Sequence, residues 1–565
     1  MQQIQQKAAS GAALGHTANT ANSTRVALEL FNTLSGKIEP LFASDGSALR
    51  MYCCGPTVYD YGHIGNFRTF LHVDVLRRAI RMNGLGIRHV MNVTDVDDKI
   101  IRNASAAGQP IGEYTARYEK AFFEDLAALG AEFPEAIARA TENIDDMVTL
   151  IEKLASEDIA YKAEDGSWYF RIARFPEYGK LSGKDLEGIQ DGARIDSDEY
   201  EKDSARDFAL WKAAKPGETS WDTRLGPGRP GWHIECSAMA MKYLGNSFDL
   251  HAGGEDLMFP HHENEIAQSE SASHVPFARH WFHVRFLLVE GKKMSKSEGN
   301  FYTLRDLLLK GHRASAIRFL LLSVPYRHQL NFTFDGLTES TNAVERLRTF
   351  HQRILTGVWP AATPGSKSPG DPSSATASAA IPGDPSSATA TAAIPGDPSS
   401  AMASSSPKVG SDDSLLDVIR TGDQKFTAAL FNDLNTAEAR AAIFDVLRAV
   451  NTAADRAALT RTEADATLAL LARFDSIFAV LEDRDAELTR AALAWAETEG
   501  KLGEADASLV ATLSLSDADI DALVAERTLA KKQRNFARAD AIRNDLLEKG
   551  ILLEDSKDGV RWKRK

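Results

Sequence analysis

Cysteine, histidine and glutamate residues far apart in the chain are of the types that bind a metal ion. The run from His261 to Glu265 has helical character, and residues four apart share a helix face, so these two side chains can bind one ion together. Cys236 and one of the adjacent Cys53 and Cys54 would complete the nitrogen, sulfur and oxygen set that zinc accepts. Neighbouring strand residues point to opposite sides, so only one of that pair can join. On the residues alone, two buried thiols beside a polar helix remain the alternative.

A glycine-rich loop from Gly55 to Asn66 has the composition of a phosphate-binding turn. It leads into a run with helical spacing, and the N–H groups and positive dipole end of a helix favour anions. Gly65 lets a ligand approach the backbone, while His63 and Asn66 can donate hydrogen bonds to phosphate oxygens. Taken in isolation, this loop is as well explained by a turn with a hydrogen-bonded histidine.

A second loop, from Gly291 to Gly299, carries Lys292, Lys293 and Lys296 together with two serines. Compact ammonium groups can follow a triphosphate as negative charge develops on the departing pyrophosphate. The loop contains neither half of a Walker A pattern, so it is not a P-loop. A solvated basic loop is the alternative.

The elements around the first loop indicate an α/β fold. A strand from Met51 to Cys54 precedes the loop, and apolar residues at helical spacing follow it: Phe67, Phe70, Leu71, Val75 and Ala79. A second strand, Ile87 to Val93, delivers Asp95, Asp97 and Asp98 beyond its carboxyl end, where open α/β sheets place their ligands. We therefore predict a Rossmann-like, doubly wound parallel sheet. Residues 104–230 are long enough to be an insertion in that sheet.

Composition and charge set limits on the class of protein. The chain has 565 residues, of which 43% are hydrophobic and 25% charged, which is typical of a globular protein with several domains. No apolar run reaches the length of about 18 residues that spans a bilayer, so we predict no membrane segment. Three cysteines cannot form a disulfide framework, and they suit a reducing compartment such as the cytosol.

The net charge of −14 means that a nucleic-acid partner must meet a local basic surface. Such a surface is expected at the end of the chain, because residues 526–565 carry 12 Lys or Arg against 7 Asp or Glu. A helical stretch is expected from Glu526 to Lys549. The last five residues, from Arg561, place Trp562 inside a basic run.

Two segments lack the residues needed for a core. Residues 1–24 are mostly Gln, Ala, Ser, Thr and Asn, and we predict a disordered extension. Residues 361–410 repeat the sequence Pro-Gly-Asp-Pro-Ser-Ser-Ala from positions 369, 382 and 395. Without apolar positions to bury between copies, this repeat indicates a flexible linker and not a solenoid. The apolar spacing that follows predicts a helical bundle.

The two loops together resemble the paired signatures of class I aminoacyl-tRNA synthetases. His63-Ile-Gly-Asn66 stands where that class has HIGH, and Lys293-Met-Ser-Lys296-Ser matches KMSKS in full. The first motif departs at its last position, where Asn66 replaces histidine. Asparagine keeps a hydrogen-bond donor, so activity is expected to survive this change.

Four longer runs resemble cysteinyl-tRNA synthetases. They begin at Met51 (MYCCGPTVYD), Asn92 (NVTDVDDKI), Gly231 (GWHIECSAM) and His251 (HAGGEDLMFPHHENE). The resemblance is strong over residues 30–355, good over the last 40 residues and absent from the two low-complexity segments. It departs at Thr223–Gly226, where the family has Ser-Pro-Trp-Gly, which affects loop packing and not chemistry.

The resemblance implies a zinc ion held by Cys54, Cys236, His261 and Glu265, with Cys53 as the spare thiol. It implies that Gly55 and Thr57 lie near the amino acid, that Trp232, Gly254 and Asp256 lie near the aminoacyl and adenosine groups, and that Lys296 contacts ATP. With His63, Asn66 and Lys293 these residues would activate L-cysteine with magnesium-bound ATP and transfer it to tRNA(Cys). A monomer in the cytoplasm is expected.

The expected domains combine the composition with the resemblance. They are a catalytic domain over 25–290 with its insertion at 104–230, a KMSKS loop and stem-contact region over 291–355, a linker over 356–411, a helical bundle over 412–515 and an anticodon-binding domain over 516–565. A cysteine ligase acting on an amino-sugar in mycothiol synthesis lacks such an end. A catalytically inactive, RNA-binding paralogue is disfavoured by the intact lysines and metal positions.

Deleting residues 361–410 is expected to leave the melting temperature and aminoacylation nearly unchanged. A flexible insertion adds a loop-closure entropy that grows only slowly with its length. Thermal unfolding of the deletion variant beside the full chain measures this, and a large fall in melting temperature would show that the repeat packs on the body.

Overall fold

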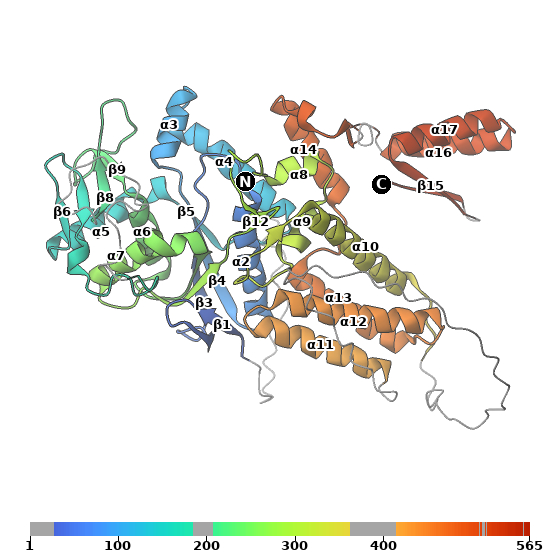
Figure 1. The fold of residues 1–565 in the computed structure, drawn as a ribbon, viewed down its shortest axis with the longest axis horizontal. Helices are drawn as coiled ribbons and strands as arrows, with labels where there is room; N and C mark the ends of the chain where they lie inside the picture. The colour runs from blue at the N-terminus through green and yellow to red at the C-terminus, as the bar shows by residue number, and fades with distance from the viewer. Residues whose placement is uncertain are drawn as a thin grey trace, which may run out of the picture.

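The computed structural model describes residues 27–184, 207–361, 414–507, 509–510, 515, 517–556 and 559–564. The expected N-terminal extension and the Pro-Ser repeat lie outside the described residues. Figure 1 shows the chain passing from a sheet-containing body through a group of long helices to a small unit at the C-terminus. No helix in the described ranges is long and apolar enough to cross a membrane.

A five-stranded parallel sheet forms the centre of the body. Its strand order is β11-β10-β3-β4-β5, with every neighbouring pair parallel. The strands are β3 (Ala48–Cys53), β4 (Gly86–Val93), β5 (Ala136–Arg139), β10 (Phe248–Gly254) and β11 (Ala278–Val284). The predicted parallel α/β sheet is confirmed.

The order of strands reverses between β3 and β10, and this opens a crevice at their carboxyl ends. From β3 the chain continues through α2 (Ile64–Met82) to β4 on one side, and from β10 through α7 (Glu263–Ser273) to β11 on the other. Ligands of open α/β sheets bind at such a reversal point. The loop that follows β3 and the turn that follows β10 therefore share one site.

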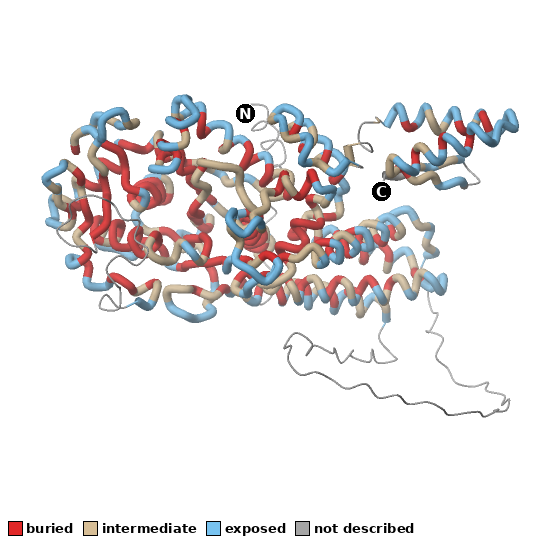
Figure 2. The backbone as a smooth tube through the Cα atoms, turned by 45° about the horizontal axis from the view of Figure 1, so that its top comes forward, coloured by how far each residue is buried: buried red, intermediate tan, exposed pale blue. Residues whose placement is uncertain are grey.

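The two faces of the sheet bury separate apolar cores. Figure 2 shows that the buried residues gather inside the body while the exposed ones lie along its outside. Cys53 packs in the core beneath α2, whereas Tyr52 and Cys54 belong to the core that contains Cys236 of α6 (Trp232–Leu244). This is the alternation expected of adjacent strand residues. Only Cys54 therefore shares a core with the third cysteine.

The segment expected as an insertion begins with parts of the body. Helices α3 (Asp98–Ala106), α4 (Ile111–Ala128) and α5 (Ile144–Ser156) accompany β5, which lies within residues 104–230 yet pairs with β4 in the main sheet. A separate antiparallel sheet then follows, of β6 (Ala160–Lys162), β7 (Trp168–Phe170), β8 (Phe208–Ala213) and β9 (Gly228–Pro230). The short, four-residue β5 gave too weak an apolar pattern to be recognised as a sheet strand.

The loop Thr223–Gly226, which departs from the family sequence, closes on itself. Thr223 Oγ1 donates to the carbonyl of Gly226 at 3.0 Å. Leu225 is buried, and its carbonyl accepts a hydrogen bond from Trp168 Nε1 at 3.3 Å. An apolar side chain and two hydrogen bonds thus support this loop.

Smaller elements complete the body on either side of the sheet. A hairpin of β1 (Glu29–Asn32) and β2 (Lys37–Pro40) precedes β3. After β11 come β12 (Leu288–Val289), β13 (Lys292–Lys293) and β14 (Asn331–Phe332), with α8 (Leu304–Leu309) and α9 (Ala314–Leu321) between the last two.

The helical region that the sequence predicted is present, and it packs against the body. It contains α10 (Phe334–Thr356), α11 (Leu415–Phe431), α12 (Thr436–Asp455), α13 (Arg461–Phe478) and α14 (Asp485–Thr498). Buried Arg318 joins it to the body, since its guanidinium donates to Asp74 Oδ2 at 2.6 Å and to the carbonyl of Phe478 at 2.5 Å. The ion pair with Asp74 lies within the body and fixes the Arg318 guanidinium, which then holds α13 through the Phe478 carbonyl.

The C-terminal unit differs from the expected single helical stretch. Helices α16 (Asp517–Lys532) and α17 (Phe536–Glu548) are separated by a turn in which Arg534 has a φ of 62° and Asn535 caps the second helix. The chain ends in a hairpin of β15 (Ile551–Ser556) and β16 (Gly559–Arg564). A small core of its own holds the unit together: Ile520, Ile542, Leu546 and Ile551.

Candidate functional site

Four potential metal ligands converge at the crevice between β3 and β10. Cys54 follows β3, Cys236 lies on α6, His261 lies in the turn η5 (Met258–His262), and Glu265 lies in the first turn of α7. All four are buried, and their ligand atoms lie within 4.8 Å of one another. The structure thus brings together the four residues expected from the sequence.

The distances within this cluster suit a tetrahedral metal ion. The sulfur atoms of Cys54 and Cys236 are 3.7 Å apart, and Cys54 Sγ lies 3.6 Å from Glu265 Oε1. In a zinc tetrahedron with bonds of about 2.0–2.3 Å, neighbouring ligand atoms stand about 3.3–3.8 Å apart. His261 Nε2, at 3.0 Å from Glu265 Oε1, is slightly closer. The donor set therefore fits zinc in both chemistry and spacing.

The protonation of the cluster also favours a cation. Burial alone would raise the pKa of the Cys236 thiol, but the hydrogen bond from Cys54 and the His261 imidazole outweigh it and bring this pKa to about 6. Burial likewise opposes ionisation of Glu265, yet His251 and His261 hold its pKa well below its usual range. Both shifts favour the thiolate and the carboxylate, and these are the forms that bind metal.

Histidines around the cluster hold the ligands in place. His251 Nε2 is hydrogen-bonded to Glu265 Oε2 at 2.8 Å, and the Nδ1 atoms of His233 and His261 are 2.9 Å apart. His262 Nε2 lies 3.4 Å from Cys54 Sγ, so Cys54, His251, His262 and Glu265 form a second possible grouping. Sequence analysis missed this support, although the density of histidines between 251 and 283 was a signal.

Glycine and tryptophan shape the space beside the cluster. A Cβ at Gly55 would stand 1.7 Å from the carbonyl oxygen of Asn92, and the Gly55 N–H donates to Asn92 Oδ1 at 2.8 Å. Trp232 is 38% exposed, and its indole stacks on the His261 ring with centroids 4.3 Å apart. The four candidate metal ligands therefore have the half-exposed Trp232 side chain next to them.

The other expected substrate residues lie along the same crevice. Thr57 forms a parallel bridge with Thr94 beyond β4. A Cβ at Gly254, the last residue of β10, would meet Asp256 Oδ1 at 2.4 Å, because the Asp256 side chain folds back over this glycine. A larger residue at position 254 would require the Asp256 side chain to move away.

His63 and Asn66 cap the helix α2 reciprocally. His63 Nδ1 accepts a hydrogen bond from the Asn66 N–H at 3.1 Å, and Asn66 Oδ1 accepts one from the His63 N–H at 3.1 Å. Burial lowers the pKa of His63 to about 4, so the ring is neutral. With Nδ1 used as an acceptor, the proton resides on Nε2, which can donate to a ligand.

The loop with Lys293 and Lys296 lies against this helix start. Lys296 Nζ donates to Asp60 Oδ2 at 2.5 Å, and the methyl group of Met294 would be 3.1 Å from a Cβ at Gly65. Lys293 is exposed in β13, and its carbonyl accepts a hydrogen bond from Asn300. The two motifs thus meet, and Asp60 is a partner that sequence analysis had not singled out.

Comparison with known proteins agrees with this arrangement. Residues 42–342 match the family model described as the class I (C) tRNA synthetase catalytic domain, and residues 425–482 match the DALR domain. A solved structure of Mycobacterium tuberculosis methionyl-tRNA synthetase in complex with methionyl-adenylate shares the fold, with a TM-score of 0.51 at 16% identity. That alignment covers 81% of this chain and 93% of the other. The chain is therefore a class I aminoacyl-tRNA synthetase.

Its relatives define the family more narrowly. The cysteine–tRNA ligase of Koribacter versatilis is 55% identical and that of Solibacter usitatus 50% identical, each over 96% of this chain and all of the relative. The enzyme of the same name from Leptospira interrogans is 40% identical over the same shares. The chain belongs to the cysteine–tRNA ligase family. A match of this length disfavours the amino-sugar ligase alternative.

We expect Cys54→Ser and His261→Ala to lower the bound zinc and cysteine activation together, since each removes a candidate metal bond. Cys53→Ser is the matched control, because its sulfur is equally buried but lies in the other core. Metal analysis and cysteine-dependent ATP–pyrophosphate exchange measure both effects. Loss of zinc from Cys53→Ser with none from Cys54→Ser would reverse the ligand assignment.

Proposed function

We propose that the chain binds one zinc ion through Cys54, Cys236, His261 and Glu265 and uses the adjoining crevice to activate L-cysteine with ATP. The observation that carries this proposal is the continuity of the two sites. The single connection after β3 supplies Cys54 to the metal cluster and His63 to the helix start. An amino acid bound at the cluster and a nucleotide bound at the helix would therefore meet between them.

Zinc is favoured at this position by the substrate it would select. Cysteine and serine differ by one atom, and packing alone discriminates such pairs only about tens to hundreds of fold. A thiolate is a much better zinc ligand than a hydroxyl, so coordination of the substrate sulfur would supply the missing selectivity. Trp232, half-exposed beside His261, is suited to cover the amino acid.

The position of His251 distinguishes the two possible groupings of metal ligands. His251 binds Glu265 through Oε2, the oxygen remote from His261, so it orients that ligand instead of competing with it. This difference favours Cys54, Cys236, His261 and Glu265 as the ligand set over the grouping that contains His251 and His262. The buried histidines then act as a supporting layer.

The nucleotide half of the site has donors for phosphate and no need of a general base. His63 Nε2–H and the ammonium of Lys296 can donate to phosphate oxygens, and the positive dipole end of α2 favours an anion there. The N–H groups of Ile64 and Asn66 are already bound to the Tyr302 carbonyl and to His63 Nδ1. The cysteine carboxylate would attack the α-phosphorus, forming a carboxyl–phosphate bond as the bond to pyrophosphate breaks. Magnesium would bind to the site together with the phosphates of ATP. Lys293 is proposed to act with Lys296 on the departing charge.

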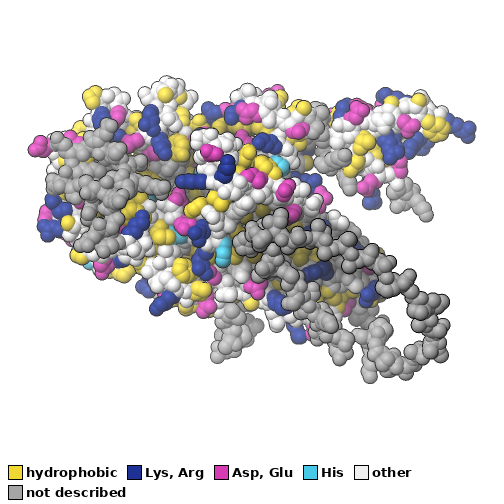
Figure 3. Space-filling model, viewed as in Figure 1, with side chains coloured by type: hydrophobic (Ala, Val, Ile, Leu, Met, Phe, Trp, Pro, Cys, Tyr) yellow, Lys and Arg dark blue, Asp and Glu magenta, His cyan; other side chains and the backbone are white. Residues whose placement is uncertain are grey.

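The aminoacyl group would then pass to the 3′ end of tRNA(Cys), with the C-terminal unit binding the anticodon. Figure 3 shows Lys and Arg side chains over this unit, mixed with acidic ones. Arg527 is buried and paired with Asp555 at 2.9 Å, so it stabilises the unit instead of meeting RNA. Lys532, Arg534 and Arg543 are exposed, as is Phe536, and these suit a single-stranded loop.

Lys296→Ala is expected to slow adenylate formation by about 10²-fold or more while changing the KM for cysteine little. Its charge is needed where negative charge builds up on the phosphates. Cysteine-dependent ATP–pyrophosphate exchange measures both constants. Lys292→Ala is the control, because this neighbouring lysine is exposed and pairs with Glu298 instead of Asp60. An unchanged exchange rate with a raised KM for cysteine would contradict the phosphate role.

Removing residues 520–565 is expected to leave ATP–pyrophosphate exchange largely intact and to reduce tRNA charging severely. The removed unit has its own core and lies outside the crevice. Charging by the full chain should weaken as salt rises, since phosphate contacts release counterions. A triple replacement of Lys532, Arg534 and Arg543 by alanine tests the same role without truncation. Equal charging by the truncated and full chains would exclude anticodon binding by this unit.

A further inference from the structure

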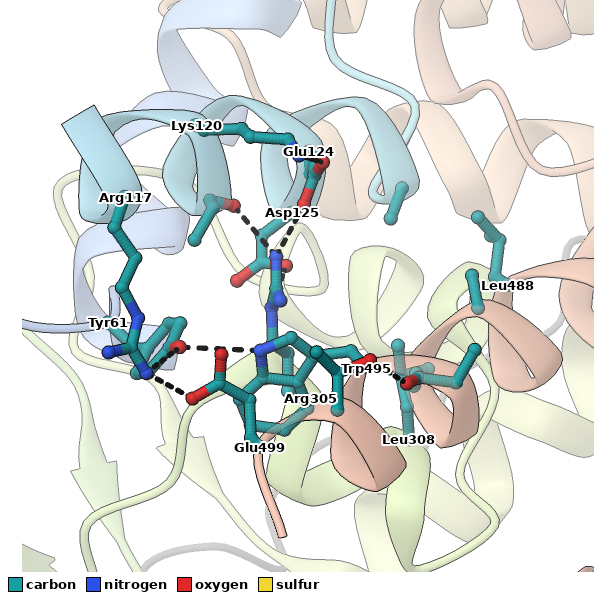
Figure 4. Close-up of a pocket in the computed structure, with 16 residues that line it drawn as sticks. Tyr61, Arg117, Lys120, Glu124, Asp125, Arg305, Leu308, Leu488, Trp495 and Glu499 are labelled. Atoms are coloured by element: carbon teal, nitrogen blue, oxygen red, sulfur yellow. Dashed lines mark hydrogen bonds and ion pairs between the residues drawn. The ribbon is translucent and has the colours of Figure 1, made fainter. Parts of the chain in front are cut away.

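A cavity of about 740 Å³ lies between the catalytic body and the helical region, beside the loop from Gly55 to Asn66, the nucleotide loop. Residues of α4, α8 and α14 line it, and Tyr61 from the loop itself forms one edge. Figure 4 shows Tyr61, Arg117, Trp495 and Glu499 gathered at that edge, joined by hydrogen bonds and an ion pair. Beside this hollow, the loop and α14 meet through these side chains.

The Tyr61 side chain is held by groups from two helices. Trp495 Nε1 donates to the Tyr61 hydroxyl at 3.3 Å, and Arg117 donates to the same oxygen at 3.2 Å. The Tyr61 and Trp495 rings meet edge to face, with centroids 5.2 Å apart and planes at 80°. Arg117 also forms an ion pair with Glu499, so α4 and α14 hold the tyrosine together.

A cation from α8 binds the same two rings. The Arg305 guanidinium lies 5.4 Å from the Tyr61 ring centroid and 4.9 Å from that of Trp495. Its own position is fixed by Asp125, whose Oδ1 accepts a hydrogen bond from Arg305 Nε at 2.8 Å. Tyr61 is therefore held by Trp495, which lies 434 residues away in the sequence, and by the cations Arg117 and Arg305.

The backbone of Tyr61 continues this contact into the site. Its N–H donates to Asp60 Oδ1 at 2.8 Å, and Asp60 Oδ2 accepts the hydrogen bond from Lys296 Nζ at 2.5 Å. The Asp60 carboxylate thus accepts a hydrogen bond from the Tyr61 N–H on one oxygen and from Lys296 on the other. Two residues further on, His63 caps the start of α2.

We propose that Tyr61 and Trp495 are positioning residues for ATP, through which α14 sets the place of Asp60, Lys296 and the start of α2. The inference rests on the proposed activation of cysteine with ATP. Neither side chain contacts the candidate metal ligands. Replacing either one should therefore change the binding of ATP and not that of cysteine. Because α14 is also the helix that leads toward the C-terminal unit, the nucleotide loop is held by the helical region as well as by its own sheet.

The test measures ATP–pyrophosphate exchange by the full chain carrying Trp495→Leu, Tyr61→Leu or both. Each single change should raise the KM for ATP about three- to tenfold and leave the KM for cysteine within twofold. The double variant should be no worse than the worse single one, because the two residues act as a unit. Trp495→Phe, which keeps an aromatic edge, should recover most of the affinity.

The control is Trp359→Leu. Trp359 is also partly buried and also donates its indole N–H, at 3.0 Å to the carbonyl of Ile354, but it lies three residues beyond the end of α10. Its replacement should leave both KM values unchanged. Thermal unfolding shows whether the leucine variants are folded. If they are not, the KM for ATP is measured on Tyr61→Phe, which removes only the hydroxyl, and a raised KM then supports the inference while an unchanged one contradicts it.

An unchanged KM for ATP in the folded Trp495 and Tyr61 variants, or multiplied effects in the double variant, would overturn this inference. If the unaltered chain catalysed no cysteine-dependent exchange, the proposed function itself would fail. The two failures are therefore distinguishable in one set of measurements.

Discussion

The close passage of the chain at Gly55 is the constraint on which the site depends. Here the connection leaving β3 runs against the carbonyl oxygen of Asn92, so closely that a Cβ would stand 1.7 Å from that oxygen. The passage lets Cys54 stay in the core with Cys236 while the chain turns outward to the helix start at His63. A wider turn would separate the metal ligands from the nucleotide loop. The reversal of strand order between β3 and β10 supplies the space into which both halves open.

Burial makes the cluster of cysteine, histidine and glutamate dependent on its own charges. Removing a carboxylate and a thiolate from water is costly unless opposite charge lies close by. His261, whose pKa is raised to about 10 because the charges of Glu265 and Cys236 outweigh its burial, supplies one such charge. A divalent cation would replace the proton on that imidazole and neutralise both anions at once. The same buried charges that would destabilise an empty core thus favour the binding of a cation by this cluster.

How much of this was predictable depends on the sequence distance between partners. Side-chain alternation separated Cys53 from Cys54, and helical spacing paired His261 with Glu265, because both are local rules. The role of His251 beside Glu265 and of Asp60 beside Lys296 could not be derived, since each depends on how strands and loops are ordered in space. The four-residue strand β5 was missed because so short a segment has no distinct apolar period. Likewise, the pairing of the buried Arg527 with Asp555 cannot be seen in a count of basic residues.

The asparagine that ends the His63-Ile-Gly-Asn66 motif shows how a residue other than histidine can cap the start of α2. Its Oδ1 accepts from the His63 N–H, while its own N–H fixes the acceptor state of His63 Nδ1. A side chain with one acceptor and one donor is sufficient for that exchange, because the carbonyl end caps the helix and the NH₂ end can face a phosphate. A histidine at position 66 would have to perform both tasks with its two ring nitrogens, in one tautomer. In the proposed reaction the Lys296 ammonium and the helix dipole would stabilise the charge on the phosphates, and the substitution alters neither of them.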